Sequence, residues 1–581
     1  MGNTSIASAL EVTTEGLENF GYGDVFISTI NGSVFILSDN VYSLRGAVME
    51  YLREELGAEV YSANCYSVDV KAEGENYVLQ EQNRVVCYDM DIRTTDVKFL
   101  GTDSYPMGYV PRAETIFLVS ISAHQTITCY VPYSTYGAEH PMWYSGYDSS
   151  SNTNALYNNT GKPAQVCFNA NGNAEELQLM KEAFLDTMIN HQYGLKKNSL
   201  GSIFIFGNQD NQDYCQCTAC LADKEKYGVY NATALKFCNS VAEMLKAWME
   251  TDEGKPYKRD FEIMFLAYDT DIGAPATYNN DTKKWEPIDQ TVVCNENVSV
   301  FFAPAGLDPK RSIYDAANDE TRYAFEGWKA CSDEVSLYLY QSNWRDVFSY
   351  YDSLSCMQEL YQFFATGNIK FIHNSGFGNP ALTRFETLTS YISSTLAKDV
   401  NADVTEATQN FFDAYFGVAS QPMKQYFDSY MAWTKHLRDD DVYKTIGVDD
   451  FKGPSYLSEI LINEVANGYV DYTKLAEWAG YIDEALLAIE PLKASDEEMY
   501  NFLYQRIIAE RLAVYFPAAY HKKNLGSLSY TTLRETFMAD CELLGISKGG
   551  WLWPDLENDL FSDWKNGSSG GGSWWEDLWP W

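Results

Sequence analysis

The segment Gly201–Cys220 reads GSIFIFGNQDNQDYCQCTAC, and the rest of the chain is interpreted around it. Its first part, Ser202–Phe206, has the length and the isoleucine and phenylalanine content of a strand buried on both faces, as in a parallel sheet. The apolar run stops at Gly207 and is followed by amides and by Asp210. Because the carboxyl ends of the strands carry the site in parallel α/β folds, Asp210 is the first candidate for chemistry.

Seven other apolar runs have the same character, and amphipathic helical stretches separate several of them. Strand and helix alternation over roughly 300 residues implies right-handed crossovers and a parallel sheet. The count of strands favours closure into a barrel over an open doubly wound sheet. We therefore expect an α/β fold, a (β/α)8 TIM-type barrel at residues 84–398, with strands at Arg84–Tyr88, Thr115–Ser122, Ala164–Phe168, Ser202–Phe206, Phe261–Ala267, Val298–Phe302, Val335–Tyr340 and Ile369–Ile372.

Two further domains and a tail are expected on either side of the barrel. Residues 1–83 read as a small N-terminal α/β domain, and residues 399–565 as a C-terminal all-α domain because strand patterns disappear there. Residues 566–581 are a Gly/Ser linker and a tryptophan-rich tail, either natural or added to the protein. The C-terminal helices are expected at Thr405–Phe416, Pro422–Leu437, Tyr456–Val465, Tyr472–Ile489, Asp496–Tyr515 and Tyr530–Leu544.

Charge and composition narrow the class of partner. With 42 basic and 81 acidic residues the net charge is -39, which disfavours nucleic acid and anionic membranes. A neutral polar substrate fits better. The sequence has no run of about 18 apolar residues, so no membrane span is expected, and its start shows no signal segment. No nucleotide loop, dinucleotide fingerprint or His-Glu-x-x-His motif is present, so no cofactor is expected. The oligomeric state is not predicted.

Carboxylates, amides and aromatic residues follow the expected strands, and cations are few. Carboxylates and amides bond sugar hydroxyls, and flat rings cover the apolar face of a pyranose, so this set is typical of a sugar site. The expected substrate-binding residues are His124, Asn169, Tyr268, Tyr340, Asn343, Trp344, His373 and Asn374.

Glycosidic bond cleavage needs one protonated carboxyl group and a second carboxylate on the other side of the bond. We assign Asp210 as general acid, with a pKa raised by burial, and Asp269 or Asp271 as base or nucleophile. An aspartate just after a strand is also a common helix cap or turn residue, and this interpretation stays open for all three. The two histidines could equally be structural, and Trp344 could be part of the core.

Cys215, Cys217 and Cys220 form a C-x-C-x-x-C pattern, with Cys167 as a possible fourth member. Four thiolates in tetrahedral reach would suit structural zinc, but such sites usually pair two C-x-x-C arms and only one is complete here. A disulfide or packed thiols is the favoured interpretation, and no metal is expected. In each case the cluster would fix the loop carrying Asp210.

Several spaced motifs carry a family resemblance over roughly His124 to Met431. They are His124, Pro132-Tyr133, His140-Pro141-Met142-Trp143-Tyr144, Gln165-Val166-Cys167-Phe168-Asn169, Asp210 with the three cysteines after it, Leu266-Ala267-Tyr268, Tyr338-Leu339-Tyr340, Asn343-Trp344, Asn401-Ala402-Asp403-Val404, Phe411-Phe412 and Tyr415-Phe416-Gly417. In these motifs the chain resembles the bacterial domain of unknown function 4838 family. It departs from that pattern at His140-Pro141-Met142, where the family usually has His-Pro-Glu. The residues before Asp210 are amides, without the Asp-Glu pair that is typical of hexosaminidases.

The resemblance implies a layout similar to that of α-glucuronidases and β-hexosaminidases, in bacteria that consume glycans. It implies a glycoside hydrolase-like protein, often exported, and so an extracellular or cell-surface location, with a cytoplasmic one left open. Two functions remain: a glycosidase acting on a polysaccharide or host glycan, and a barrel that binds carbohydrate without cleaving it.

Overall fold

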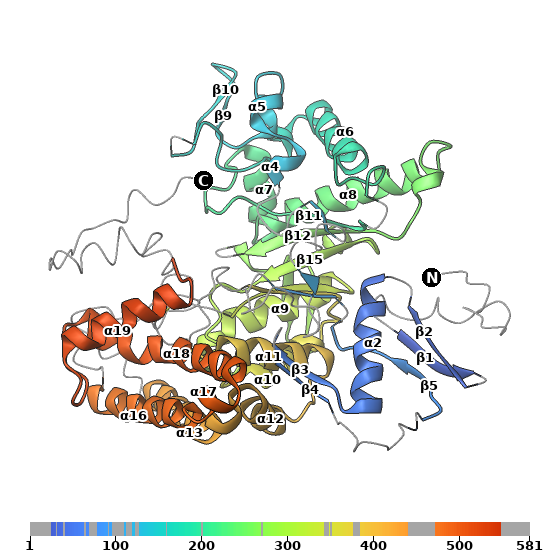
Figure 1. Cartoon of the computed structure of the whole chain (residues 1–581). Helices are drawn as coiled ribbons and strands as arrows, with labels where there is room; N and C mark the ends of the chain where they lie inside the picture. Colours follow the sequence, from blue (N-terminus) through green and yellow to red (C-terminus); the bar gives the residue numbers. More distant parts are fainter. Residues whose placement is uncertain are drawn as a thin grey trace.

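The protein was analysed as a computed structural model that describes the chain from residue 25 to residue 547, apart from residues 31, 39–40, 63–64, 69–77, 79, 91, 96–109, 112–118, 122–126, 159, 199–200, 269–270, 342–347, 349–350, 376–383 and 440–470. Figure 1 shows a small N-terminal sheet, a parallel sheet with helices around it, and a group of C-terminal helices. The predicted helix Tyr456–Val465 and the tail at 566–581 lie outside the described residues.

The N-terminal sheet is antiparallel and has the order β2-β1-β5. Its elements are β1 (Val25–Ile30), β2 (Ser33–Ser38) and β5 (Asn83–Val86), with α2 (Val41–Leu56) beside them and a hairpin of β3 (Glu59–Ser62) and β4 (Cys65–Ser67). Val25 and Ile27 pack with Ala47 of the helix. The prediction that Arg84–Tyr88 is a barrel strand is wrong, because β5 pairs with β1. The side chains of β5 alternate in solvent exposure, which is typical of an antiparallel strand with one face toward solvent.

The central sheet has eight strands in the order β7-β6-β17-β16-β15-β12-β11-β8, and every neighbouring pair is parallel. The last strand along the chain, β17, pairs with the first, β6. This order is compatible with a TIM-like α/β fold. The strands are β6 (Ile92–Thr95), β7 (Val110–Pro111), β8 (Val119–Ile121), β11 (Ile203–Phe206), β12 (Glu262–Tyr268), β15 (Val298–Ala303), β16 (Val335–Tyr340) and β17 (Phe371–Ser375).

Both faces of this sheet are buried, as its apolar strands require. One face presents a compact cluster made of Ile203, Ile205, Met264, Leu266, Phe301, Ala303, Tyr338 and Phe371. The rings of Phe301 and Phe371 are 5.5 Å apart although β16 separates their strands, so this face is the concave one. The residues between them, such as Phe204 and Phe265, belong to the large core shared with the helices.

Two barrel strands differ from those expected. Ala164–Phe168 makes only an isolated bridge, between Val166 and Tyr144, so the prediction of a sheet strand there is wrong. The sheet instead begins with β6 and β7, whose sequences IRTT and VP contain no apolar run for the pattern to detect.

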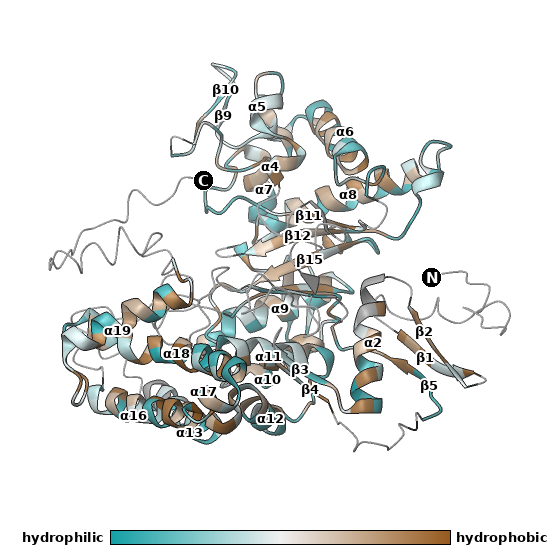
Figure 2. Ribbon diagram, in the orientation of Figure 1, coloured by the Kyte–Doolittle hydropathy of each residue, from teal (hydrophilic) through white to brown (hydrophobic). Residues whose placement is uncertain are grey.

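Helices surround the sheet, and several of them combine hydrophilic and hydrophobic residues, seen as teal and brown in Figure 2. The helix α8 packs on the strands β12 and β15. The helices are α4 (Ile127–Tyr130), α5 (Tyr133–Tyr136), α6 (Ala174–Asn190), α7 (Thr218–Tyr227), α8 (Asn231–Met249), α9 (Asp319–Cys331), α10 (Met357–Ala365) and α11 (Glu386–Lys398). Two hairpins, β9 (Tyr147–Asp148) with β10 (Thr153–Asn154) and β13 (Ala276–Asn279) with β14 (Lys284–Pro287), interrupt the connections.

The C-terminal elements are all helical among the described residues. They are α12 (Val404–Phe416), α13 (Ser420–Asp439), α16 (Tyr472–Ile489), α17 (Leu492–Ser495), α18 (Glu497–Tyr520) and α19 (Tyr530–Leu543). The buried α18 joins them to α11, because the Glu510 carboxylate accepts the Phe385 backbone N–H at 2.9 Å, and it holds α12 because Arg506 donates to the Tyr415 carbonyl at 2.7 Å. None of the described helices is long and apolar enough to cross a lipid bilayer.

Packing of the side chains on the concave face stabilises the central sheet, and the variant Phe301→Ala tests this contribution. Phe301 is fully buried between the rings of Tyr338 and Phe371. Removing its ring opens a cavity among strands that cannot collapse, so urea denaturation should show a loss of about 3–5 kcal/mol in the free energy of unfolding. The exposed control Leu487→Ala should change it by less than about 0.5 kcal/mol. Equal small effects would contradict the packing described.

Candidate active site at the carboxyl ends of the parallel strands

One glutamine from a distant part of the chain holds the loop that carries Asp210. The Gln165 side-chain oxygen accepts the Gln209 backbone N–H at 3.0 Å, and its nitrogen donates to the carbonyl oxygens of Gln209 at 2.8 Å and Asn211 at 3.0 Å. In return, the Asn211 amide donates to the Ala164 carbonyl at 3.1 Å. A primary amide both donates and accepts, so one side chain fixes the backbone on both sides of the half-buried Asp210.

Two tyrosines from other strands converge on the same place. Tyr268 ends β12 and Tyr340 ends β16, and a side-chain hydrogen bond links them. Burial raises the pKa of Tyr340 well above its usual value, and the nearby Tyr268, Tyr338 and Asp210 raise it further. The Asp210 carboxylate therefore lies within Coulombic reach of the Tyr340 hydroxyl. Three predicted site residues, far apart in the sequence, therefore lie in one region near the carboxyl ends of β11, β12 and β16.

His373 lies on the same concave face, deeper in the sheet. Its Nδ1 is 2.8 Å from the Thr94 hydroxyl oxygen on β6, and its ring centroid is 4.9 Å from that of Tyr338. The Tyr338 hydroxyl is 2.8 Å from that of Ser375. The rings of Tyr338 and Tyr340 are 5.2 Å apart, so this polar layer lies directly beneath the tyrosine pair.

Two predicted sugar-binding amides have structural partners elsewhere. Asn374 is fully buried on the outer face of β17, where its oxygen accepts from the Tyr361 hydroxyl at 3.2 Å and its nitrogen donates to Ser393 at 3.4 Å. Asn169 donates to the Asp223 carboxylate at 3.1 Å. These contacts tie Asn374 to α10 and α11 and Asn169 to α7.

Asp271 follows β12 and is tied to the start of α8, the helix that precedes β12 in the chain. It is buried, and its Oδ1 accepts the Tyr230 backbone N–H at 2.8 Å at the start of α8. Its Oδ2 is buried without a hydrogen-bond partner among the described residues. Burial raises the pKa of this carboxyl to about 6, against the lowering effect of the backbone hydrogen bonds. It lines a cavity of about 30 Å³, shared with Asn208 and Tyr214, which has room for one water.

Four predicted site residues are not placed by the structure. His124, Asp269, Asn343 and Trp344 lie outside the described residues, so their roles stay predictions.

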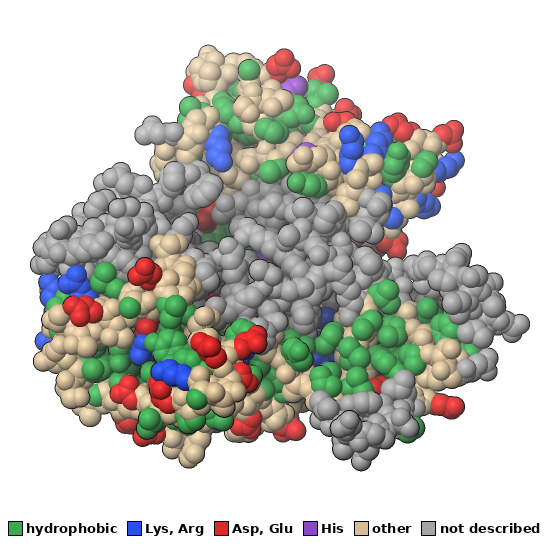
Figure 3. Space-filling view, viewed as in Figure 1, with side chains coloured by type: hydrophobic (Ala, Val, Ile, Leu, Met, Phe, Trp, Pro, Cys, Tyr) green, Lys and Arg blue, Asp and Glu red, His purple; other side chains and the backbone are tan. Residues whose placement is uncertain are grey.

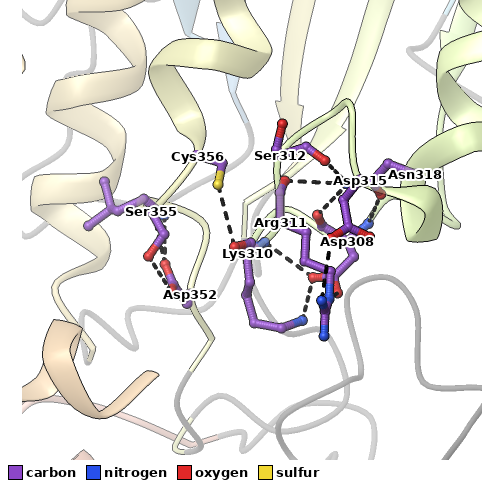
Figure 4. Close-up of polar contacts among 10 residues, drawn as sticks. Asp308, Lys310, Arg311, Ser312, Asp315, Asn318, Asp352, Ser355 and Cys356 are labelled. Atoms are coloured by element: carbon purple, nitrogen blue, oxygen red, sulfur yellow. Dashed lines mark hydrogen bonds and ion pairs between the residues drawn. The ribbon is translucent and has the colours of Figure 1, made fainter. Parts of the chain in front are cut away.

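A buried charged group on the loop between β15 and α9 was not found from the sequence. Lys310 and Arg311 converge on Asp308, with N···O distances of 2.5 and 3.3 Å (Figure 4). Asp308 and Lys310 are only 4% and 3% exposed, so this is an internal ion pair. Burial lowers the pKa of Lys310, and the charge of Asp308 opposes that shift. The run Leu-Asp-Pro-Lys-Arg-Ser has the composition of a solvated turn, and nothing in it signals burial.

Four cysteine side chains come together beside the Asp210 loop. The sulfur atoms of Cys167, Cys215, Cys217 and Cys220 all lie within 4.8 Å of one another. Among the described residues they are the group of side chains placed to hold a metal ion, and Cys215 and Cys220 also line the small cavity that Asp271 lines.

Comparisons with known proteins give a family and distant structural likenesses. A family model described as Domain of unknown function (DUF4838) matches residues 88–428. No curated protein matches the chain. A family 89 glycoside hydrolase from Clostridium perfringens in complex with PUGNAc is 11% identical, with 90% of this chain and 61% of that chain covered and a TM-score of 0.43. A GH138 enzyme targeting pectin rhamnogalacturonan II is 10% identical, with 91% of this chain and 66% of that chain covered and a TM-score of 0.37.

The buried Asp271 predicts a pH-dependent difference between the protein and its Asp271→Asn variant. Since its pKa is raised from 3.8 to about 6, the folded state binds this proton more tightly than the unfolded chain does. The stability so gained is present below about pH 4 and is lost as the pH rises through about 6. The asparagine cannot ionise and still accepts from Tyr230, so the variant should gain up to about 3 kcal/mol relative to the wild type between pH 4 and pH 7.

Urea denaturation at the two pH values measures this difference. The exposed Asp213→Asn on the same loop as Asp210 is the control and should show no pH-dependent difference from the wild type. An Asp271→Asn effect that is identical at both pH values would contradict the raised pKa.

Proposed function

The chain belongs to the family described as Domain of unknown function (DUF4838), and we propose that it is a glycoside hydrolase acting on a polysaccharide or host glycan. The observation that carries this proposal is the hydrogen-bonded pair of Tyr268 and Tyr340 at the strand ends, within electrostatic range of Asp210. A fixed carboxylate beside aromatic rings is the combination that glycosidic bond cleavage uses. In this proposal the eight strands of the central sheet, from β6 to β17, close into a (β/α)8 barrel, and the protein works outside the cell or at its surface.

The roles of the carboxylates follow from strand neighbours. Asp210 follows β11 and Asp269 follows β12, and these two strands are paired in parallel. Neighbouring parallel strands lie about 4.8 Å apart and glycosidases use carboxylates about 5–9.5 Å apart, so two adjacent strands are suited to supply such a pair. We assign Asp210 as general acid and Asp269 as base or nucleophile.

In this proposal the remaining site residues bind the sugar or hold the catalytic groups in position. Tyr268 and Tyr340 would cover the apolar face of a pyranose, with His373 in the layer beneath them. Asp271 supports this arrangement from behind, since it fixes the start of α8 to the loop that follows β12. Gln165 holds Asp210 in place.

Asp210→Asn tests the proposal once a substrate is found by screening the purified protein against glycans and aryl glycosides. Loss of the acid should lower kcat/KM by about 10²–10⁴-fold. Glycan affinity, measured by calorimetry, should stay largely unchanged because the asparagine keeps the size and hydrogen-bonding capacity of the side chain. Unchanged turnover would remove Asp210 from the mechanism.

Asp213→Asn is the matched control, because it removes an exposed carboxylate from the same loop and should leave turnover unchanged. Glycan binding without hydrolysis across the whole panel would favour the alternative function, a barrel that binds carbohydrate without cleaving it.

A further inference from the structure

We propose that Cys167, Cys215, Cys217 and Cys220 form a tetrathiolate site for one zinc ion. All four sulfur atoms lie within 4.8 Å of one another. Two of the separations, Cys167 to Cys217 and Cys167 to Cys220, are 3.8 and 3.7 Å. A zinc ion with four Zn–S bonds of about 2.3 Å in tetrahedral geometry holds its sulfurs about 3.8 Å apart. These two separations match a single tetrahedral ion, and the other sulfur pairs lie within 4.8 Å, close enough to share one.

The backbone around the cluster has the form of two metal-binding arms. In the first, Cys217 caps the N-terminus of α7, and the Cys220 backbone N–H points at its sulfur at 3.4 Å. In the second, the chain turns back after Cys167 through Asn171, whose φ is 51° and whose backbone N–H reaches the Cys167 sulfur at 3.2 Å. The first arm supplies three sulfurs and the second supplies one, whose position the Asn171 N–H fixes.

These donors fit thiolates better than thiols. A thiolate accepts hydrogen bonds strongly, and outer hydrogen bonds to metal-bound sulfur orient the ligand and stabilise its charge. The Asn169 amide adds a third donor, 3.7 Å from the Cys220 sulfur. Four thiolates this close together repel one another unless a cation lies between them, so the arrangement calls for a divalent ion.

Burial makes this a structural site. Cys167, Cys215 and Cys220 are 0%, 5% and 4% exposed, and Cys217 is half-buried. With four protein ligands and no open position, the ion would not bind substrate. All four side chains are free thiols in the structure, and the separations exceed the S–S bond length of about 2.05 Å, which favours a shared ion over a disulfide.

The site would anchor the far end of the Asp210 loop. Asp210 lies between Gln209, which Gln165 holds, and Cys215, which the ion would hold to Cys167. Both anchors come from the same segment, so zinc would complete a two-point attachment of the loop. Metal binding itself is independent of the proposed glycosidase function.

Metal analysis of the full-length protein, purified under reducing conditions without chelators and supplied with zinc chloride, tests the proposal. We expect about one zinc per chain by mass spectrometry of the metal, and an X-ray absorption signal of four sulfurs at about 2.3 Å. A protein that binds no zinc while its four thiols titrate freely, or one in which peptide mapping finds a disulfide among them, would overturn it. So would one ion per chain coordinated by nitrogen or oxygen instead.

The variant Cys217→Ser should lose bound zinc, from about one ion per chain to below about 0.1, because three thiolates no longer close the site. Cys129→Ser, which changes an exposed cysteine outside the cluster, should keep the ion. If Cys217→Ser fails to fold, cobalt substitution of the wild type decides: visible bands typical of tetrahedral cobalt thiolate support the site, and their absence in cobalt-loaded protein counts against it. None of these readouts uses a glycan, so zinc binding without hydrolysis would leave this inference intact.

Discussion

Burial of the parallel strands on both faces is the constraint on which the rest of the structure depends. A strand covered on both sides can carry polar groups only toward its ends, because unpaired polar atoms inside are costly. The concave face follows this rule in layers. Ile205, Met264 and Phe301 fill its depth, His373 and the Tyr338 hydroxyl form hydrogen-bonded pairs above them, and Tyr340 with Asp210 stands at the edge. The polar chemistry of the protein is therefore gathered at one edge of the sheet.

The loops at that edge are held by three kinds of interaction. The Gln165 amide ties the backbone around Asp210, the Lys310 and Asp308 ion pair holds the loop after β15, and the cysteine cluster lies at the far end of the Asp210 loop. Loops are usually the mobile part of a fold. Where a loop carries a reacting group, its fixed position supplies part of the catalytic effect, since the group is oriented before the substrate arrives.

In this acidic protein, buried cations have partners, and acidic side chains are spread over the surface. Several of its few cations are buried with partners: Arg511 bonds Asp540 at 2.6 and 2.8 Å, and Arg506 donates to a main-chain carbonyl. Removing a partner from such a buried charge costs far more than an exposed pair contributes. Acidic side chains remain spread over the described surface in Figure 3. With a net charge of -39, that surface repels anionic polymers, so under the proposed function a neutral glycan is favoured over an acidic one.

The sequence by itself determined the elements whose apolar period shows which side is buried. Those elements include β11, β12, β15, β16 and the helix Tyr472–Ile489, whose expected and observed bounds agree. It also placed Asp210, Tyr268 and Tyr340 at strand ends, because position after an apolar run is a local property. Only the tertiary structure decided that IRTT at Ile92–Thr95 is a sheet strand, that Lys310 is internal, and that Cys167 lies against Cys217 and Cys220. These three features depend on contacts with partners more than 30 residues away in the chain, or on burial by other segments. A local pattern of residues cannot predict such contacts.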